Sequence, residues 1–197
     1  MNKKFYDYLF DFKNAIPPAK GRVLLAEPLL QGRYFARSVI LLVEHNQKGS
    51  MGLVLNKPLS FNVNEKVDLF SSCESPLFLG GPVHTNHLFY IHTAGNLIPQ
   101  SYPLSNDLFW GGDLKTVQNL LDNKIITSEQ IRFFTGYAGW DKLQLVDEID
   151  EKSWIVSLLS TETILQEAPQ DLWKIAVSEL GKKYRHWLNF PENPQHN

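Results

Sequence analysis

The sequence contains one cysteine, Cys73, among its 197 residues. A single cysteine cannot form an internal disulfide, which excludes the disulfide frameworks of small secreted proteins. No apolar run approaches the ~20 residues of a membrane-spanning helix. No long apolar segment follows Lys3 and Lys4, so we expect no signal peptide. These absences predict a cytoplasmic protein that does not engage a membrane.

An excess of either charge is also missing, because 19 Lys and Arg against 21 Asp and Glu leave a net charge of −2. This balance argues against a general polyanion binder and leaves room only for a local basic patch. Hydrophobic residues make up 43% and charged residues 20%, as in ordinary globular domains. A chain of this length buries about 70% of its unfolded surface, so it can fold without the added stability of a disulfide bond or a structural metal ion.

Two neighbouring apolar runs form the clearest pattern in the sequence. The first, residues 39–43, is VILLV. Its odd and even positions are all apolar, and since these point to opposite faces of a strand, the run predicts a strand buried on both faces. The second, residues 53–55, follows the polar loop HNQKGSMG, and Pro58 ends it because proline lacks an N–H. We therefore predict a central antiparallel hairpin. Each of its buried aliphatic side chains contributes about 1.5–3 kcal/mol, so the hairpin should form the nucleus of the core.

The rest of the sequence predicts strands arranged in hairpins, with helices between and after them, which is typical of an α+β fold. Asp113 is a suitable N-cap, and Gly181 a suitable stop, for the two longest helices. The expected strands cover residues 22–26, 77–79, 88–93, 108–110, 131–135 and 154–159, and the expected helices cover 62–70, 114–123, 141–149 and 170–180.

Residues 1–20 are predicted to form an N-terminal helical extension. Phe5, Leu9 and Phe12 fall on one helical face, and Pro17 and Pro18 would end the helix. This face either caps the core or docks another subunit or partner, and we favour the first interpretation. Residues 21–190 are expected to form the main domain, and 191–197 a disordered tail.

Polar residues gather at both ends of the predicted hairpin. Arg37 and Ser38 precede the first strand and should lie close to Asn56 at the end of the second, whereas Glu44 and His45 lie at the loop end. Serine, histidine and glutamate are the residue types of a hydrolytic triad. The strand nevertheless separates Ser38 from His45 by roughly 20 Å at about 3.3 Å per residue, so they cannot share a proton. These polar groups therefore form two sites.

Each of these sites has a structural and a functional interpretation. A charge beside a buried strand needs a partner, so Arg37 is either held by carbonyls or a carboxylate, or lines a cleft that binds an anion. Glu44 and His45 either serve the turn or form the wall of a polar pocket. We favour the structural interpretation at both ends.

Two further segments carry candidate binding residues. Gly80 and Gly81 either make a tight turn or approach a phosphate, although the Gly-Lys-Ser/Thr ending of a P-loop is missing. Tyr137 and Trp140 either pack in the core or form an aromatic wall for a planar ligand. No cluster of cysteines and histidines predicts a metal site, and we expect no cofactor.

Several sequence blocks, in this order, resemble the AlgH/YqgE family of bacterial proteins. They are FARSVILLVEHNQKGSMGLVLNKPL; FLGGPV with the later IHT; GYAGW with the following Gln144, Leu145, Glu148, Ser153 and Trp154; and DLWKIAVSELG. Together they span about residues 21–181. Two positions depart from the family pattern: Leu143 replaces a frequent glycine, and Val43 replaces a cysteine found in some members, which removes a redox role there.

The resemblance implies a complex α+β fold with a branched, partly barrel-like sheet built on hairpins and surrounded by helices. It also implies a regulator of transcription that acts by binding, with a protein partner or DNA, and it supplies no catalytic residue to carry over. No helix-turn-helix is visible, and the most basic region contains Lys174, Lys182, Lys183 and Arg185, whose charge Asp171 and Glu179 dilute. The alternative is a small-molecule-binding protein or an enzyme with a pocket near Glu44, His45 and Trp140.

Overall fold

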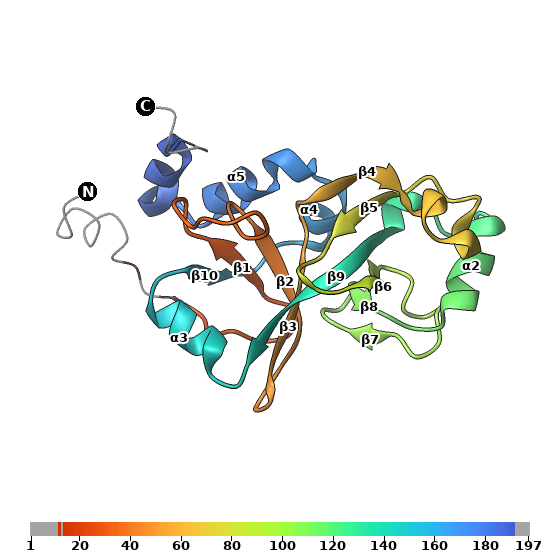
Figure 1. The fold of residues 1–197 in the computed structure, drawn as a ribbon, viewed down its shortest axis with the longest axis horizontal. Coiled ribbons are helices and arrows are strands. Elements are labelled where there is room, and N and C mark those ends of the chain that lie inside the picture. Colours follow the sequence, from red (N-terminus) through yellow and green to blue (C-terminus); the bar gives the residue numbers. More distant parts are fainter. Residues whose placement is uncertain (1–11, 13, 192–197) are drawn as a thin grey trace.

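The computed structural model describes residue 12 and residues 14–191. It confirms the α+β class: ten strands form one branched sheet, and helices surround it (Figure 1). The strands are β1 (Val23–Ala26), β2 (Val39–Asn46), β3 (Gly49–Val54), β4 (Pro58–Asn62), β5 (Pro76–Leu79), β6 (Val83–His92), β7 (Tyr102–Pro103), β8 (Phe109–Trp110), β9 (Ile131–Asp141) and β10 (Trp154–Ser157).

The helices lie between and after the strands. The α-helices are α2 (Leu114–Asp122), α3 (Gln144–Asp150), α4 (Thr161–Gln166) and α5 (Pro169–Glu179), and the 3-10 helices are η1 (Val63–Glu65), η2 (Asp68–Phe70), η3 (Ser128–Gln130) and η4 (Lys182–Asn189). No helix among the described residues is both long and apolar enough to cross a membrane.

The predicted central hairpin is confirmed as the pair β2 and β3, in which Ile40 lies opposite Val54 and Leu41 opposite Leu53. All five side chains of residues 39–43 are fully buried. The strands extend further than predicted, because most of the polar loop between the apolar runs is itself strand. A bulge after Leu42 shifts the register, and the Asn46 side chain accepts a hydrogen bond from the Lys48 N–H at 2.8 Å in the turn.

Strand β9 connects the two halves of the sheet. Its first half pairs with β5 on one edge and β6 on the other, and its second half pairs with β3. The sequence predicted that this strand ends before Gly136, which is wrong, because the strand continues to Asp141. The sheet is branched, as predicted, with the order β10-β1-β2-β3-β9-β6-β8-β7 and β4 and β5 off this path. Over the described residues it stays open, so the partly barrel-like closure is not present.

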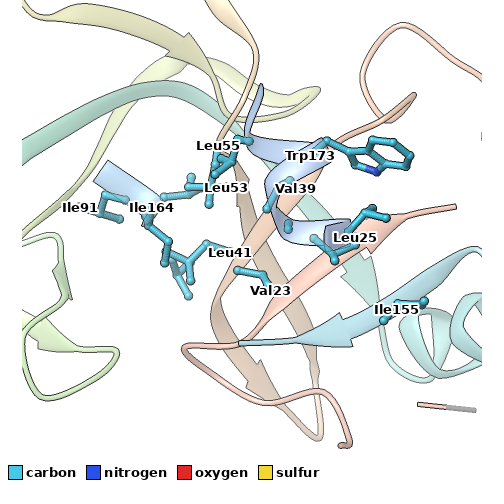
Figure 2. Close-up of a cluster of buried hydrophobic side chains, with 14 of the residues drawn as sticks. Val23, Leu25, Val39, Leu41, Leu53, Leu55, Ile91, Ile155, Ile164 and Trp173 are labelled. Atoms are coloured by element: carbon cyan, nitrogen blue, oxygen red, sulfur yellow. The ribbon is translucent and has the colours of Figure 1, made fainter. Parts of the chain in front are cut away.

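The hairpin carries core residues on both faces. One face meets α4 and α5, where labelled side chains from seven elements converge (Figure 2): Val23, Leu25, Val39, Leu41, Leu53, Leu55, Ile91, Ile155, Ile164 and Trp173. The other face packs on Trp140, Leu145 and Trp154. A third cluster lies around α2, η1 and η2, next to the first half of β9. Burial of β2 on both sides explains its uninterrupted apolar sequence.

Most helix signals in the sequence agree with the structure. The Asp113 carboxylate caps α2 by accepting a hydrogen bond from the Thr116 N–H at 2.7 Å, and Gly181 ends α5 with φ at +99°. The predicted helix over 62–70 is instead two 3-10 helices, η1 and η2. Helix α4 was not predicted, because it has six residues and only Ile164 is buried.

Phe12 is the one described residue of the predicted N-terminal face. It is buried and lies edge-on to Trp187 of η4, with 5.5 Å between the ring centroids, and to Tyr184 at 6.3 Å. Phe5 and Leu9, and nearly all of the predicted tail, lie outside the described residues. Phe12 thus packs against η4, and the predicted helix over the preceding residues stays a prediction.

Candidate functional site

The structure places the polar residues of the hairpin at its two ends, where Arg37 and Asn56 line one cavity and Glu44 lines another. At the beginning of β2, the Asn56 side chain accepts a hydrogen bond from the Val39 N–H at 3.0 Å and donates one to the Arg37 carbonyl at 2.9 Å. Asn56 follows the end of β3 at Val54, so its amide continues the ladder of backbone hydrogen bonds. This role is structural.

Arg37 lines a cavity of about 580 Å³ between the loop before β2 and helix α5. Its guanidinium donates to the carbonyl of Phe190 and lies over the Trp173 ring, with the central carbon 4.6 Å from the ring centroid. These contacts favour the structural role of Arg37. The neighbouring Ser38 is fully buried, and its hydroxyl has no hydrogen-bond partner among the described residues. A nucleophile without solvent access cannot meet a substrate.

The loop end of the hairpin contains a second cavity of about 460 Å³, lined by Glu44, Ser50, Tyr137 and Trp140 among others. His45 pairs across the strands with Ser50, with 2.7 Å between Nδ1 and Oγ, and Glu44 is exposed. His45 and Ser38 lie at opposite ends of β2. Ser38, Glu44 and His45 therefore do not assemble a hydrolytic triad.

Trp140 is buried and belongs to a polar network with half-buried Glu148 and exposed Gln144. Its indole N–H donates to Oε2 of Glu148 at 2.8 Å, and the indole N–H of Trp154 donates to the same oxygen at 2.7 Å. The other carboxylate oxygen, Oε1, accepts from the Gln144 amide at 3.0 Å. Glu148, on helix α3, thus satisfies two core tryptophans at once. The sequence singled out Trp140, but it gave no sign of this shared carboxylate.

Tyr137 is half-buried and packs edge-on against Phe89, with ring centroids 5.6 Å apart, while the His84 ring lies 5.8 Å away. His87 lies beside His84, at 5.1 Å between centroids. Within the described part of the chain, no group of His, Cys, Asp or Glu could hold a metal ion. Tyr137 faces the cavity at the loop end and is the one aromatic candidate that keeps partial solvent access there.

Gly80 and Gly81 cross closely over strand β9. A Cβ on Gly80 would lie 2.3 Å from the Gly136 carbonyl oxygen, and one on Gly81 would lie 2.2 Å from the Tyr137 carbonyl carbon. The Gly80 N–H donates to the Thr135 carbonyl at 2.9 Å, and its carbonyl accepts from Val54. These backbone groups are already used within the sheet, which explains the glycines by close packing rather than by a phosphate.

The sequence did not single out Arg132, which the structure buries in the first half of β9 with 7% of its surface exposed. Its guanidinium donates to the carbonyls of Leu55 at 3.1 Å and Leu165 at 2.9 Å, and lies 4.7 Å from the ring centroid of Phe78. Burial lowers the pKa of Arg132 to about 10, so the side chain stays charged at neutral pH. The only sequence signal is one charge inside an apolar strand.

His92 is a second buried polar residue that sequence analysis missed. Its Nε2 lies 2.9 Å from the Gly111 carbonyl oxygen, and its Nδ1 accepts a hydrogen bond from the Ala94 N–H at 3.2 Å. This pair of contacts fits a neutral imidazole with its proton on Nε2. Burial lowers the pKa of His92, which favours the same neutral form.

The most basic surface lies on η4. Tyr184 and Trp187 face the core, whereas Lys182, Lys183 and Arg185 are exposed. Residues 180–191 contain these three cations and no Asp or Glu. The structure thus separates an apolar inner face of η4 from a cationic outer face.

Known proteins share both the sequence and the fold. A family described as AlgH-like matches residues 23–185. The UPF0301 protein BF2109 of Bacteroides fragilis is 40% identical over 185 residues, covering 93% of this chain and 94% of that protein. Protein DIP2367 from Corynebacterium diphtheriae has the same fold, with a TM-score of 0.78 at 24% identity over 94% of this chain and 100% of that chain.

The solution structure of the AlgH protein from Pseudomonas aeruginosa is also similar. It has a TM-score of 0.69 at 26% identity, over 87% of this chain and 94% of that chain. The family match covers both ends of the hairpin, all of β9 and the basic residues of η4 up to Arg185. By its sequence over 23–185 and by its branched sheet, the chain belongs to the AlgH-like family.

Proposed function

We propose that this protein is a regulator of transcription that acts by binding rather than by catalysis, and that the basic surface of η4 contacts duplex DNA. The resemblance to AlgH/YqgE proteins supplies the regulatory role. A cytoplasmic location is part of this proposal and stays a prediction. The observation that carries the DNA contact is the exposure of Lys182, Lys183 and Arg185 on one short helix that contains no Asp or Glu itself, although Glu179 lies three residues before it.

The geometry of η4 suits contact with phosphates. Tyr184 and Trp187 lie edge-on with 5.6 Å between ring centroids, and Phe12 packs on both, so the inner face is fixed in the core. The cations on the outer face are therefore presented from a rigid support. Lys174 adds an exposed cation on α5, which packs against η4. Local positive charge of this kind supports DNA binding even in a chain of net charge −2.

Binding is better supported than catalysis because the residue types of a reaction are separated or already engaged. Ser38 is buried, His45 pairs with Ser50, and Trp140 donates to Glu148. The small-molecule alternative has one supporting feature, the cavity beside Glu44 and Tyr137. Within it, Glu44 is an exposed carboxylate, and the nearest hydroxyl–imidazole pair, Ser50 with His45, has no carboxylate hydrogen-bonded to the imidazole among the described residues.

The proposal is tested by the salt dependence of binding to a fluorescent DNA duplex, measured by anisotropy. Each phosphate contact contributes a slope of about −0.9 in log K against log salt. We expect the triple variant Lys182→Gln, Lys183→Gln, Arg185→Gln to flatten this slope by about 2 to 3 and to weaken binding at low salt.

The matched control is the triple variant Lys48→Gln, Lys124→Gln, Lys142→Gln, which removes the same charge from exposed residues elsewhere. It should retain the wild-type slope. No binding of the wild-type protein at low salt would exclude direct DNA contact, and equal loss in both triple variants would exclude η4 as the contact surface.

A further inference from the structure

Arg132 is a buried cation that has no carboxylate partner among the described residues. Its contacts are two backbone carbonyls, of Leu55 and Leu165, and the face of Phe78. A guanidinium carries more N–H donors than two carbonyls use. Burying a charge without an opposite charge is costly. The fold therefore maintains an unneutralised positive charge with donors to spare.

A cavity of about 490 Å³ opens beside this guanidinium, between β5, η3 and the connection from α4 to α5. Its volume lies within the range of small-molecule sites. One wall is apolar and includes Phe78, Ile131 and Leu165. An organic molecule could place an apolar body on this wall and a charged group against Arg132.

Two further features of the cavity favour a negative group. Ser75 is 2% exposed and lines the cavity; its Oγ accepts a hydrogen bond from the Cys73 thiol at 3.1 Å, which leaves its own hydroxyl hydrogen to donate. Helix α5 begins here, with Ala168 as an N-cap that has no side-chain cap and Pro169 in the first turn. Pro169 has no N–H and the Asp171 N–H bonds to the Ala168 carbonyl, so this helix start adds at most the partial positive charge of the Gln170 N–H.

The rim of the cavity sets the charge of the ligand. Glu129 and Glu167 line it and are both exposed. Two carboxylates at the mouth disfavour a polyanion, such as DNA or a nucleoside triphosphate, by like-charge repulsion. A ligand with one negative group can pass them and place that group at the guanidinium, whose planar fork matches a carboxylate.

We propose that this cavity is a binding site for a small organic monocarboxylate. The carboxylate would lie against Arg132 and the Ser75 hydroxyl, and the apolar part of the molecule would lie on the wall that contains Phe78 and Leu165. This site is separate from the basic surface of η4, so either could exist without the other.

The test is a titration of the 15N-labelled protein with sodium benzoate and sodium butyrate, followed by NMR, with sodium chloride and inorganic phosphate added at equal ionic strength as comparison salts. We expect benzoate and butyrate to shift the amide signals of residues 128–132 and 165–170 in a saturable manner. Chloride should not do so, and phosphate should bind more weakly, because it carries more charge past the rim and has no apolar body.

Two variants remove the site in different ways. Arg132→Met keeps an unbranched apolar side chain on Phe78 but removes the charge, and should weaken benzoate binding about 10- to 100-fold, as expected for a lost charged hydrogen bond. Ser128→Phe fills the exposed rim without touching Arg132, and should weaken it similarly. The control Arg37→Met removes the other guanidinium that lies over an aromatic ring, in a different cavity, and should bind as the wild type does.

The inference is overturned if neither carboxylate produces saturable shifts, if the shifts map outside this cavity, or if Arg132→Met binds benzoate as tightly as the wild type. Equal binding of phosphate and benzoate would also overturn it, since it would show a general anion site. If Arg132→Met does not fold, Ser128→Phe and the position of the shifts in the wild type still decide the outcome.

Discussion

A charged side chain lies beside each end of strand β9, half-buried Glu148 at one end and buried Arg132 at the other, and the two have different surroundings. At the Trp140 end, the Glu148 carboxylate receives hydrogen bonds from two indoles and an amide, all from side chains. At the Arg132 end, the charge meets, among the residues that the structure describes, only backbone carbonyls and a ring, beside a cavity. A charge surrounded by matched donors holds a fold together, whereas a charge with spare donors is available to a ligand.

The largest effect should follow from removing the carboxylate at the Trp140 end. Glu148→Leu leaves the indole N–H groups of Trp140 and Trp154 without an acceptor, and unsatisfied buried donors cost about 1–3 kcal/mol each. We expect a loss of about 3 kcal/mol in the free energy of unfolding, measured with urea. Glu148→Gln keeps an acceptor oxygen and should lose about 1 kcal/mol. Equal stability of the wild type and Glu148→Leu would remove the contrast between the two ends.

A pH-dependent loss of stability is expected at the Arg132 end. His92 pairs with Ile131 across the sheet, and burial lowers its pKa in the folded state below the ordinary value of 6.5. Below pH 6.5 the unfolded chain therefore binds a proton that the folded protein does not. The contribution of neutral His92 to the free energy of unfolding is fully present above this pH. It is lost as the pH drops toward the folded-state pKa, by at most about 1.4 kcal/mol per pH unit.

Chemical unfolding between pH 7.5 and about pH 5 measures this slope, which lies in the window where an unperturbed histidine titrates. The variant His92→Asn keeps an acceptor near Ala94 and should flatten the curve, even though it is less stable. His84→Asn replaces an exposed histidine of the same sheet and should leave the curve unchanged. A wild-type curve as flat as that of His92→Asn would contradict a neutral, buried His92.

The smallest effect on stability is expected from Arg132→Met. Replacing a buried charge with an apolar side chain of similar length is often nearly neutral, because the cost of burying the charge disappears with the charge. We expect a change within about 1 kcal/mol, since the lost hydrogen bonds to Leu55 and Leu165 offset that gain. A loss as large as that of Glu148→Leu would mean that Arg132 serves the fold, and both ends of β9 would then be alike.

The sequence predicted those parts of the fold in which one segment carries its own signal. Residues 39–43 are apolar at odd and even positions alike, which is sufficient to indicate a strand with two buried faces. Asp113 and Gly181 mark helix ends because capping depends on adjacent backbone. The extension of β9 was missed because Gly136 normally indicates a turn, and here it permits close contact with the Gly81 backbone instead.

The candidate sites were less predictable because their contacts join different elements of the fold. Arg132 bonds to carbonyls of Leu55 and Leu165, which lie 77 and 33 residues away. The donors to Glu148 lie only four to eight residues away but come from β9, α3 and β10, and only the i, i+4 pair of Gln144 and Glu148 follows from helix spacing alone. The sequence did separate the polar groups of the hairpin into two sites, because strand geometry alone fixes that distance.

Strand β9 is shared by both halves of the sheet, and this limits how the molecule can move. A hinge between the halves would have to bend β9 where the Gly80 and Gly81 backbone crosses it within hydrogen-bond distance. The halves should therefore not open separately, and the slowest-exchanging amides should run along β9 and lose protection only when the whole domain unfolds. Regulation by this protein would then depend on whether a partner or ligand is bound at its surface or in its cavities, not on closure of one half of the sheet against the other.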